Sequence, residues 1–196
     1  MIEYFFQELD KAWKPTGVEP ILLPVIGSTA LFLQCNYDRG TKDSDILEID
    51  DIAAGKALLK LAGQGSAFAG KHRMHIQLVT RGFPFLPPKA IFHSLDPLNA
   101  QLKHFKIEAL DVVDVVVSKL KPFRVQDRDD IQAVVNLGLV DPNKLLKRFL
   151  LAKEHWLMDS RGRELPSYIE NLNLVQRDWL LVPETSIALP DFIFEQ

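Results

Sequence analysis

The chain has 196 residues, of which 47% are hydrophobic, and it carries a formal net charge of −3 with a pI near 6.0. This length supports one sizeable core, or a catalytic half and a smaller helical half, and the weak negative charge argues against binding nucleic acid with the whole surface. A single cysteine excludes an internal disulfide, and no apolar run reaches membrane-spanning length. The stretch MIEYFFQELDKAW is acidic and amphipathic, unlike a signal peptide, so we expect a cytoplasmic protein without a membrane partner.

Residues 1–120 are expected to alternate between helices and strands. The apolar periodicity indicates, in chain order, a helix over 2–14, a strand over 21–26, a helix over 29–35, a strand over 45–49, a helix over 52–61, and strands over 72–80, 90–94 and 105–110. Pro24 in the first strand indicates a sheet edge or a bulge, because proline has no N–H for the ladder. Asp50-Asp51 is placed to cap the helix that follows. Residues 63–70 and the proline-rich residues 81–88 are expected to be loops.

Helices predominate in the rest of the chain. We expect a helix over 112–120 with Asp111 as its cap and a helical segment from Asp127 onward. Asp141 and Pro142 are expected to open the next helix, as its cap and first-turn proline, so that helices follow over 144–158 and 167–180. Strands first and helices afterwards predict an α+β fold, with an α/β domain over 1–120, a helical C-terminal subdomain over 121–196, and a soft boundary between them.

The stretch VIGSTALFLQCNYDRGTKDSDILEID, residues 25–50, carries the strongest chemical signal. Gly27 and Ser28 form a turn at a helix start, where backbone N–H groups and a hydroxyl are suited to holding phosphate oxygens. Asp43 and Asp45 stand two residues apart on a predicted strand, so their side chains project from the same face and both can reach one metal ion. A phosphate cradle beside a carboxylate pair predicts metal-assisted nucleotidyl transfer.

These residues resemble the signature of the nucleotidyltransferase superfamily that includes DNA polymerase beta, and especially its AbiEii-type branch of bacterial toxins and related proteins. The resemblance covers about residues 20–135 and implies a mixed sheet flanked by helices. It implies that Asp43 and Asp45 are catalytic and hold Mg²⁺, and that an NTP is bound by Gly27, Ser28, Arg39 and Thr41. The implied partners are a tRNA, protein or small-molecule acceptor and an antitoxin encoded nearby.

A second constellation lies in DVVVSKLKPFRVQDRDDIQAVV, residues 114–135. Its Lys-Leu helix end and acid-rich helix start resemble the same branch, which implies that Lys119 contacts the triphosphate and that Asp127 or Asp130 orients the lysine or the acceptor. The alternative is structural, because acids at a helix N-terminus interact favourably with the helix dipole.

The third acid of active family members has no counterpart here. The strand on which the resemblance would place it carries His75 and Gln77 instead, so His75 is a candidate base or ligand, with a structural histidine as the alternative. Two hypotheses follow: an enzyme of low or altered activity, and a non-catalytic nucleotide-binding or protein-interaction module. Six basic residues are candidates for binding an RNA acceptor, with a solvated surface as the alternative: Lys144, Lys147, Arg148, Lys153, Arg161 and Arg163.

Overall fold

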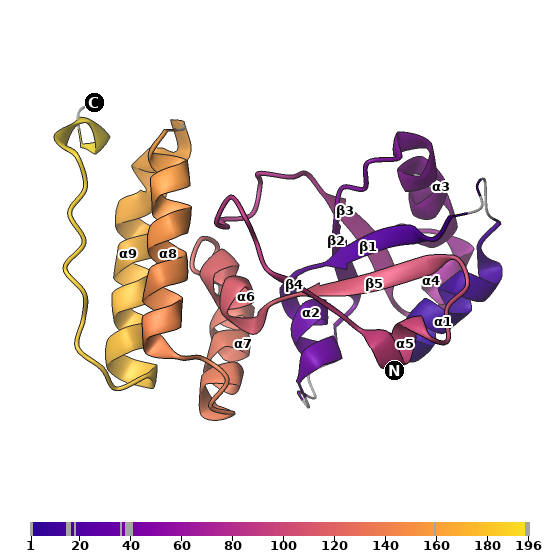
Figure 1. Cartoon of the computed structure of the whole chain (residues 1–196), viewed down its shortest axis with the longest axis horizontal. Helices are drawn as coiled ribbons and strands as arrows, with labels where there is room; N and C mark the ends of the chain where they lie inside the picture. The colour runs from indigo at the N-terminus through magenta and orange to yellow at the C-terminus, as the bar shows by residue number, and fades with distance from the viewer. Residues whose placement is uncertain are drawn as a thin grey trace. The chain divides into compact units, whose positions relative to one another are not determined.

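A computed structural model describes residues 2–14, 17, 19–35, 37, 41–158 and 160–194. The chain divides into two compact units (Figure 1). The first unit comprises residues 1–83 and 91–111, and the second comprises residues 84–90 and 112–196. Each unit is described by itself.

The first unit is built on a mixed five-stranded sheet with the order β3-β2-β1-β5-β4. Strands β1 and β5 are parallel, as are β2 and β3, whereas β1 with β2 and β4 with β5 are antiparallel. The strands are β1 (Ile21–Val25), β2 (Asp43–Leu47), β3 (His75–Val79), β4 (Phe92–Ser94) and β5 (Phe105–Leu110). The predicted α+β fold with a mixed sheet flanked by helices is confirmed.

Helices connect these strands. They are α1 (Ile2–Ala12), α2 (Gly27–Gln34), α3 (Ile52–Ala62), α4 (Ala67–His72) and α5 (Asp96–Asn99). The predicted cap of α3 is confirmed, because the Asp51 carboxylate accepts hydrogen bonds from the backbone N–H groups of Ala53 and Ala54. The predicted loop over 63–70 is wrong at its end, since the Ser66 hydroxyl accepts a hydrogen bond from Ala69 N and starts α4.

Pro24 lies in a central strand, so the predicted sheet edge is wrong. The Ile21 N–H donates to His104 O at the start of β5, and N–H directions alternate along a strand. Position 24 therefore turns its missing N–H toward β2, where the ladder with β1 has one register pair, Val25 with Ile46. The proline is tolerated because β2 pairs with β1 so briefly.

The two faces of the sheet differ. Leu23, Val25, Ile46, Ile76 and Ile107 alternate toward one face and are buried, and α3 packs there, with Gly55 against Leu78. The intervening residues of β1, β2 and β3 share the opposite face, because residues that pair directly across strands project from the same side. That opposite face carries, among others, Leu22, Pro24, Asp43, Asp45, Leu47, His75 and Gln77.

The described residues of the second unit form helices and loops without strands. Its elements are α6 (Val112–Lys119), α7 (Val125–Asn136), α8 (Pro142–Leu157), a 3₁₀ turn over Ser160–Glu164, α9 (Leu165–Leu174), a π-helical turn over Val175–Trp179, and a 3₁₀ turn over Asp191–Ile193. Four aromatic residues form the centre of its core, with ring centroids between 5.0 and 6.1 Å apart: Phe85, Phe149, Trp156 and Tyr168. Asp141 caps α8 as predicted, since its carboxylate accepts from Lys144 N.

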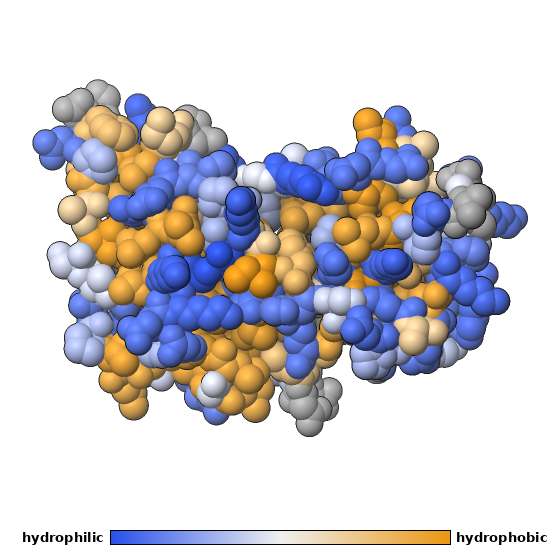
Figure 2. Space-filling view, in the orientation of Figure 1, coloured by the Kyte–Doolittle hydropathy of each residue, from blue (hydrophilic) through white to orange (hydrophobic). Residues whose placement is uncertain are grey.

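Exposed apolar residues are scattered over the surface in view. Figure 2 shows them in small groups among hydrophilic residues, and single exposed apolar residues are normal for a folded protein. Within the described ranges, no helix is both long enough and apolar enough to cross a membrane.

Candidate functional site

Asp43 and Asp45 lie on β2, on the sheet face opposite the buried core. Asp43 is exposed and Asp45 is half-buried, whereas Ser44 between them is fully buried on the core side. The alternation of the strand therefore presents two carboxylates together, as the sequence predicted.

The Gly27-Ser28 turn lies directly beside this pair. Gly27 has a φ of +64°, and a Cβ at this position would lie 3.0 Å from Asp45 Oδ2. The Ile26 N–H also donates to Asp45 O at 2.9 Å, which fixes the turn against β2. A glycine is needed here for two reasons: an L side chain rarely adopts this φ, and its first carbon would crowd the carboxylate. The start of α2 and the Asp45 carboxylate thus share one site.

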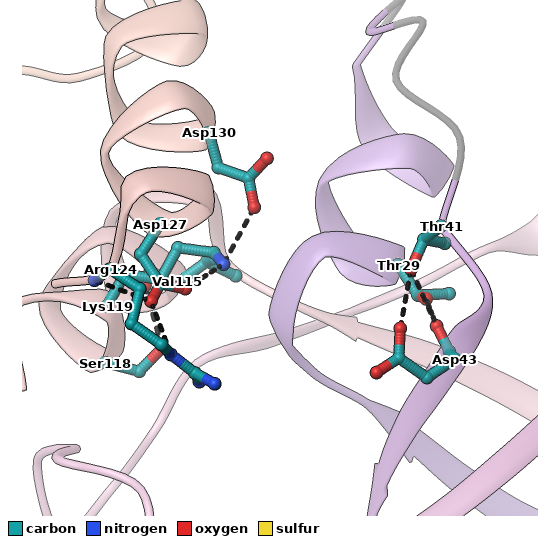
Figure 3. Close-up of polar contacts among 9 residues, drawn as sticks. All are labelled: Thr29, Thr41, Asp43, Val115, Ser118, Lys119, Arg124, Asp127 and Asp130. Atoms are coloured by element: carbon teal, nitrogen blue, oxygen red, sulfur yellow. Dashed lines mark hydrogen bonds and ion pairs between the residues drawn. The ribbon is translucent and has the colours of Figure 1, made fainter. Parts of the chain in front are cut away.

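Two threonines position Asp43 (Figure 3). The Thr41 hydroxyl lies 2.9 Å from Asp43 Oδ1 and 3.0 Å from Asp43 O, and the buried Thr29 hydroxyl donates to Asp43 O at 3.0 Å. Thr41, predicted to bind nucleotide, is therefore bonded to a site carboxylate, and Thr29 links α2 to β2. The role of Thr29 was missed, although it directly follows Gly27-Ser28. Arg39, also predicted to bind nucleotide, lies outside the described residues.

The neighbouring strand β3 places His75 opposite Asp43 and Gln77 opposite Asp45. Residues paired in register share a face, so these two side chains flank the carboxylates where the resemblance places the third acid. In the described parts of the chain, no group of three or more His, Cys, Asp and Glu side chains is arranged to hold a metal ion. Among the residues that the structure describes, Asp43 and Asp45 thus face the site without a third carboxylate on β3.

The donor chemistry of the pair fits Mg²⁺. This cation prefers oxygen ligands and is commonly bound by one or two carboxylates together with substrate phosphates and water. Asp43 and Asp45 supply two carboxylates on one face, and the adjacent turn leaves room for Asp45 by having no Cβ. With a phosphate chain on the turn, both kinds of ligand would lie side by side.

Lys119 belongs to a buried ion cluster in the second unit (Figure 3). Its Nζ lies 3.0 Å from Asp127 Oδ1 and 2.8 Å from Asp130 Oδ2, and the Asp130 side chain is completely buried. Asp127 also accepts from the backbone N–H of Arg124, at 3.1 Å, so it caps the start of α7. The expected contact between the lysine and an aspartate is present, and the contact of Lys119 with a triphosphate stays a prediction.

Arg148 and Arg161, which were considered for RNA binding, contact other side chains of the second unit. Arg148 is buried, with its guanidinium bonded to both Asp114 carboxylate oxygens at 2.5 and 2.6 Å and to Lys89 O at 2.8 Å. The Arg161 guanidinium lies over the Trp156 ring, 4.1 Å from its centroid. The prediction is wrong for Arg148, because a buried and paired guanidinium is not available to phosphates. Its place in α8 gave no warning, since the partner lies far away in sequence.

Comparison with known families agrees with the geometry of the first unit. A family model described as "Nucleotidyltransferase of unknown function (DUF6036)" matches residues 6–170. No curated protein and no solved structure matched the chain. The match supports the superfamily assignment, while the AbiEii-type branch and its antitoxin stay predictions.

Proposed function

The chain belongs to this nucleotidyltransferase family, and from that premise we propose that it transfers a nucleoside monophosphate from an NTP to a hydroxyl group in a reaction that uses Mg²⁺. The observation that supports the proposal most strongly is the close approach of the Gly27-Ser28 turn, which is suited to binding phosphate, to the carboxylate pair. Gly27 lies against Asp45, and Asp43 projects from the same face of β2.

Each part of the site has a separate role in this proposal. The backbone N–H groups at the start of α2 and the Ser28 hydroxyl hold the β- and γ-phosphates, since a helix N-terminus attracts anions. Asp43 and Asp45 hold Mg²⁺, which would supply charge neutralisation on the phosphate oxygens. Thr41 fixes the orientation of Asp43 by its bond to Oδ1.

The reaction forms one bond and breaks one. The acceptor oxygen attacks the α-phosphorus, the bond from that phosphorus to the bridging oxygen of the β-phosphate breaks, and pyrophosphate leaves on the opposite side. The hydroxyl proton passes to a base, for which His75 is the candidate beside Asp43, or to water. Because Gln77 cannot accept the proton as a carboxylate does, we expect slow turnover.

Lys119 has a supporting role in the same proposal. Asp127 and Asp130 hold its buried ammonium group in one position, so a contact with the triphosphate requires the ammonium to exchange one of these carboxylates for a phosphate oxygen. The two aspartates are positioning residues.

A non-catalytic nucleotide-binding module is the second candidate. It is favoured by one observation, the neutral Gln77 in register with Asp45. Such a module would bind Mg²⁺ and NTP without transferring the nucleotide.

Labelled nucleotides separate the two candidates. The protein is incubated with Mg²⁺ and cell extract, and each NTP is supplied with the label on either the α- or the γ-phosphate. Transfer places the α-label on an acceptor and releases the γ-label as pyrophosphate, and Asp43→Asn abolishes both. Retention of both labels in intact NTP by wild-type protein, with every base tested, would reject the enzymatic proposal.

A further inference from the structure

A second feature of the first unit is a pocket at the start of β1. The pocket has a volume of about 250 Å³ and belongs entirely to the first unit. Its lining comprises Pro20, Ile21, Leu22, Pro24, Ile49, Asp50, Asp51 and Arg81. Leu22 is 45% exposed although it lies in a central strand, so this part of the sheet presents an apolar surface to solvent.

The strand register relates the pocket to the aspartates. Val25 pairs with Ile46 in the antiparallel ladder, which brings Pro24 next to Leu47, and beyond the end of β2 both Leu22 and Ile49 line the pocket. At about 3.4 Å per residue, the end of β2 at Leu47 lies about 7 Å from Asp45, and the pocket begins there. Pro24 and Leu47 therefore form an apolar floor that leads from the carboxylates to the pocket.

The direction of this floor matters for the chemistry. In nucleotidyl transfer, the attacking oxygen and the leaving pyrophosphate lie roughly in line on opposite sides of the α-phosphorus. The Gly27-Ser28 turn follows the end of β1, whereas the pocket lies toward the start of that strand. With pyrophosphate on the turn, the acceptor approaches from the pocket side.

The polar residues of the pocket limit what it binds. Arg81 is the cationic residue among the described lining residues, and its guanidinium already contacts the Asp50 carboxylate at 3.2 Å and Glu48 O at 3.1 Å. Asp50 and Asp51 outnumber it, and the Asp50 side chain is 94% exposed. A phosphodiester chain would meet two carboxylates and an engaged arginine, which is the reverse of a nucleic-acid site. Asp51 is engaged as the cap of α3, so the carboxylate that attracts an ammonium group is that of the exposed Asp50, which also carries the contact with Arg81.

We infer that this pocket is the acceptor subsite, and that the acceptor is a small hydroxyl-bearing molecule with an apolar group and an ammonium group. The assignment to an acceptor rests on the proposed function. The apolar group packs on Leu22, Pro24 and Ile49, the ammonium group lies near Asp50, and the hydroxyl reaches Asp43 and Asp45. A pocket of this size is smaller than a whole drug-sized site, so it holds one end of the acceptor.

Three probes with the same ring and different charge test the ligand class: phenethylamine, phenethyl alcohol and phenylacetate. Binding to the full chain is followed without NTP from the NMR signals of the Leu22 and Ile49 methyl groups. We expect phenethylamine to shift these signals and to bind at least about fivefold more tightly than phenylacetate, the factor that one weak charge pair supplies. Equal or tighter binding of phenylacetate would overturn the inference.

Variants inside and outside the pocket test whether phenethylamine binds there. Leu22→Ala is expected to weaken phenethylamine about three- to tenfold, because an apolar contact is lost, and Leu59→Ala changes an exposed leucine of α3 outside the pocket as its control. Asp50→Asn is expected to reduce the preference for amine over acid. Equal effects of Leu22→Ala and Leu59→Ala would contradict the site.

The experiments distinguish failure of the acceptor subsite from failure of the proposed nucleotidyl transfer. Asp43→Asn is expected to abolish transfer while leaving phenethylamine binding unchanged. If the probes bind as expected and no nucleotide is transferred, the pocket stands and the proposed function fails. If nucleotide is transferred and the probes do not bind at Leu22 and Ile49, the acceptor subsite is rejected.

Discussion

Two groups of aspartates in this chain look alike in sequence and differ in structure. Asp43 and Asp45 stand on a sheet face beside a glycine turn, and Asp43 is exposed. Asp127 and Asp130 are buried and share Lys119 between them. A carboxylate on an accessible face has coordination sites for a ligand, whereas a buried and paired carboxylate mainly fixes local structure. The first group is therefore expected to control activity, and the second to control stability.

The largest expected effect is on stability, at Asp130. Asp130→Ala removes one partner of a buried ion pair and should lower the free energy of unfolding by about 3–5 kcal/mol, measured by urea denaturation. Asp129 directly precedes Asp130 and is exposed, so Asp129→Ala should change the free energy of unfolding by no more than about 0.5 kcal/mol. Similar values for the two variants would show that the cluster does not stabilise the second unit.

At Asp45 we expect a large effect on activity and a small effect on stability. Asp45→Asn should lower the rate of nucleotide transfer about 10²–10³-fold, because a charged ligand of the reacting centre is lost. Its free energy of unfolding should stay within about 0.5 kcal/mol of the wild type, since the side chain is only half-buried. A variant that unfolds more easily and keeps its transfer rate would reverse the assignment of roles.

Adding the missing third acid next to Asp45 tests further whether the aspartates of β2 control activity. Gln77→Asp places a carboxylate opposite Asp45 and is expected to raise the transfer rate about 10²-fold, a typical contribution of a general base. Without Mg²⁺ the added like charge should destabilise the protein by up to about 1 kcal/mol. As a control, Gln64→Asp adds the same charge at an exposed loop position. It should change neither the transfer rate nor the stability. An unchanged rate in Gln77→Asp would favour the non-catalytic module.

The smallest expected effect concerns the orientation of Asp43. Thr41→Val removes the hydroxyl next to Asp43 Oδ1 and should lower the transfer rate about three- to tenfold, which corresponds to one hydrogen bond of about 0.5–1.5 kcal/mol. In Thr80→Val the lost hydroxyl is one that donates to Glu48 at 3.2 Å, and the rate should stay constant. Equal rates in both variants would remove Thr41 from the site.

The fold was predictable where local signals and tertiary packing agree. The alternation that presents Asp43 and Asp45 together, the Asp51 and Asp141 caps and the strand over 105–110 are all confirmed. Each depends on residues within a few positions of one another, so the sequence pattern contains the relevant information.

Features that depend on distant partners were not predictable. The position of Pro24 in a central strand follows from the short pairing of β2 with β1, and the burial of Arg148 follows from Asp114, 34 residues away. The buried hydroxyl of Thr29 gave no signal of its contact with Asp43 O. The pocket at Leu22 likewise combines the beginning of β1 with residues that follow β2 and β3.

The most direct test of the central claim is the binding of Mn²⁺, used in place of Mg²⁺, together with a non-hydrolysable NTP analogue. Electron paramagnetic resonance measures the free Mn²⁺ as protein is added. The account predicts that wild-type protein and Asp129→Asn bind Mn²⁺ when the analogue is present, and that Asp43→Asn and Asp45→Asn each lose this binding. Unchanged Mn²⁺ binding in both of those last variants would contradict the claim that the aspartate pair of β2 is the metal and nucleotide site.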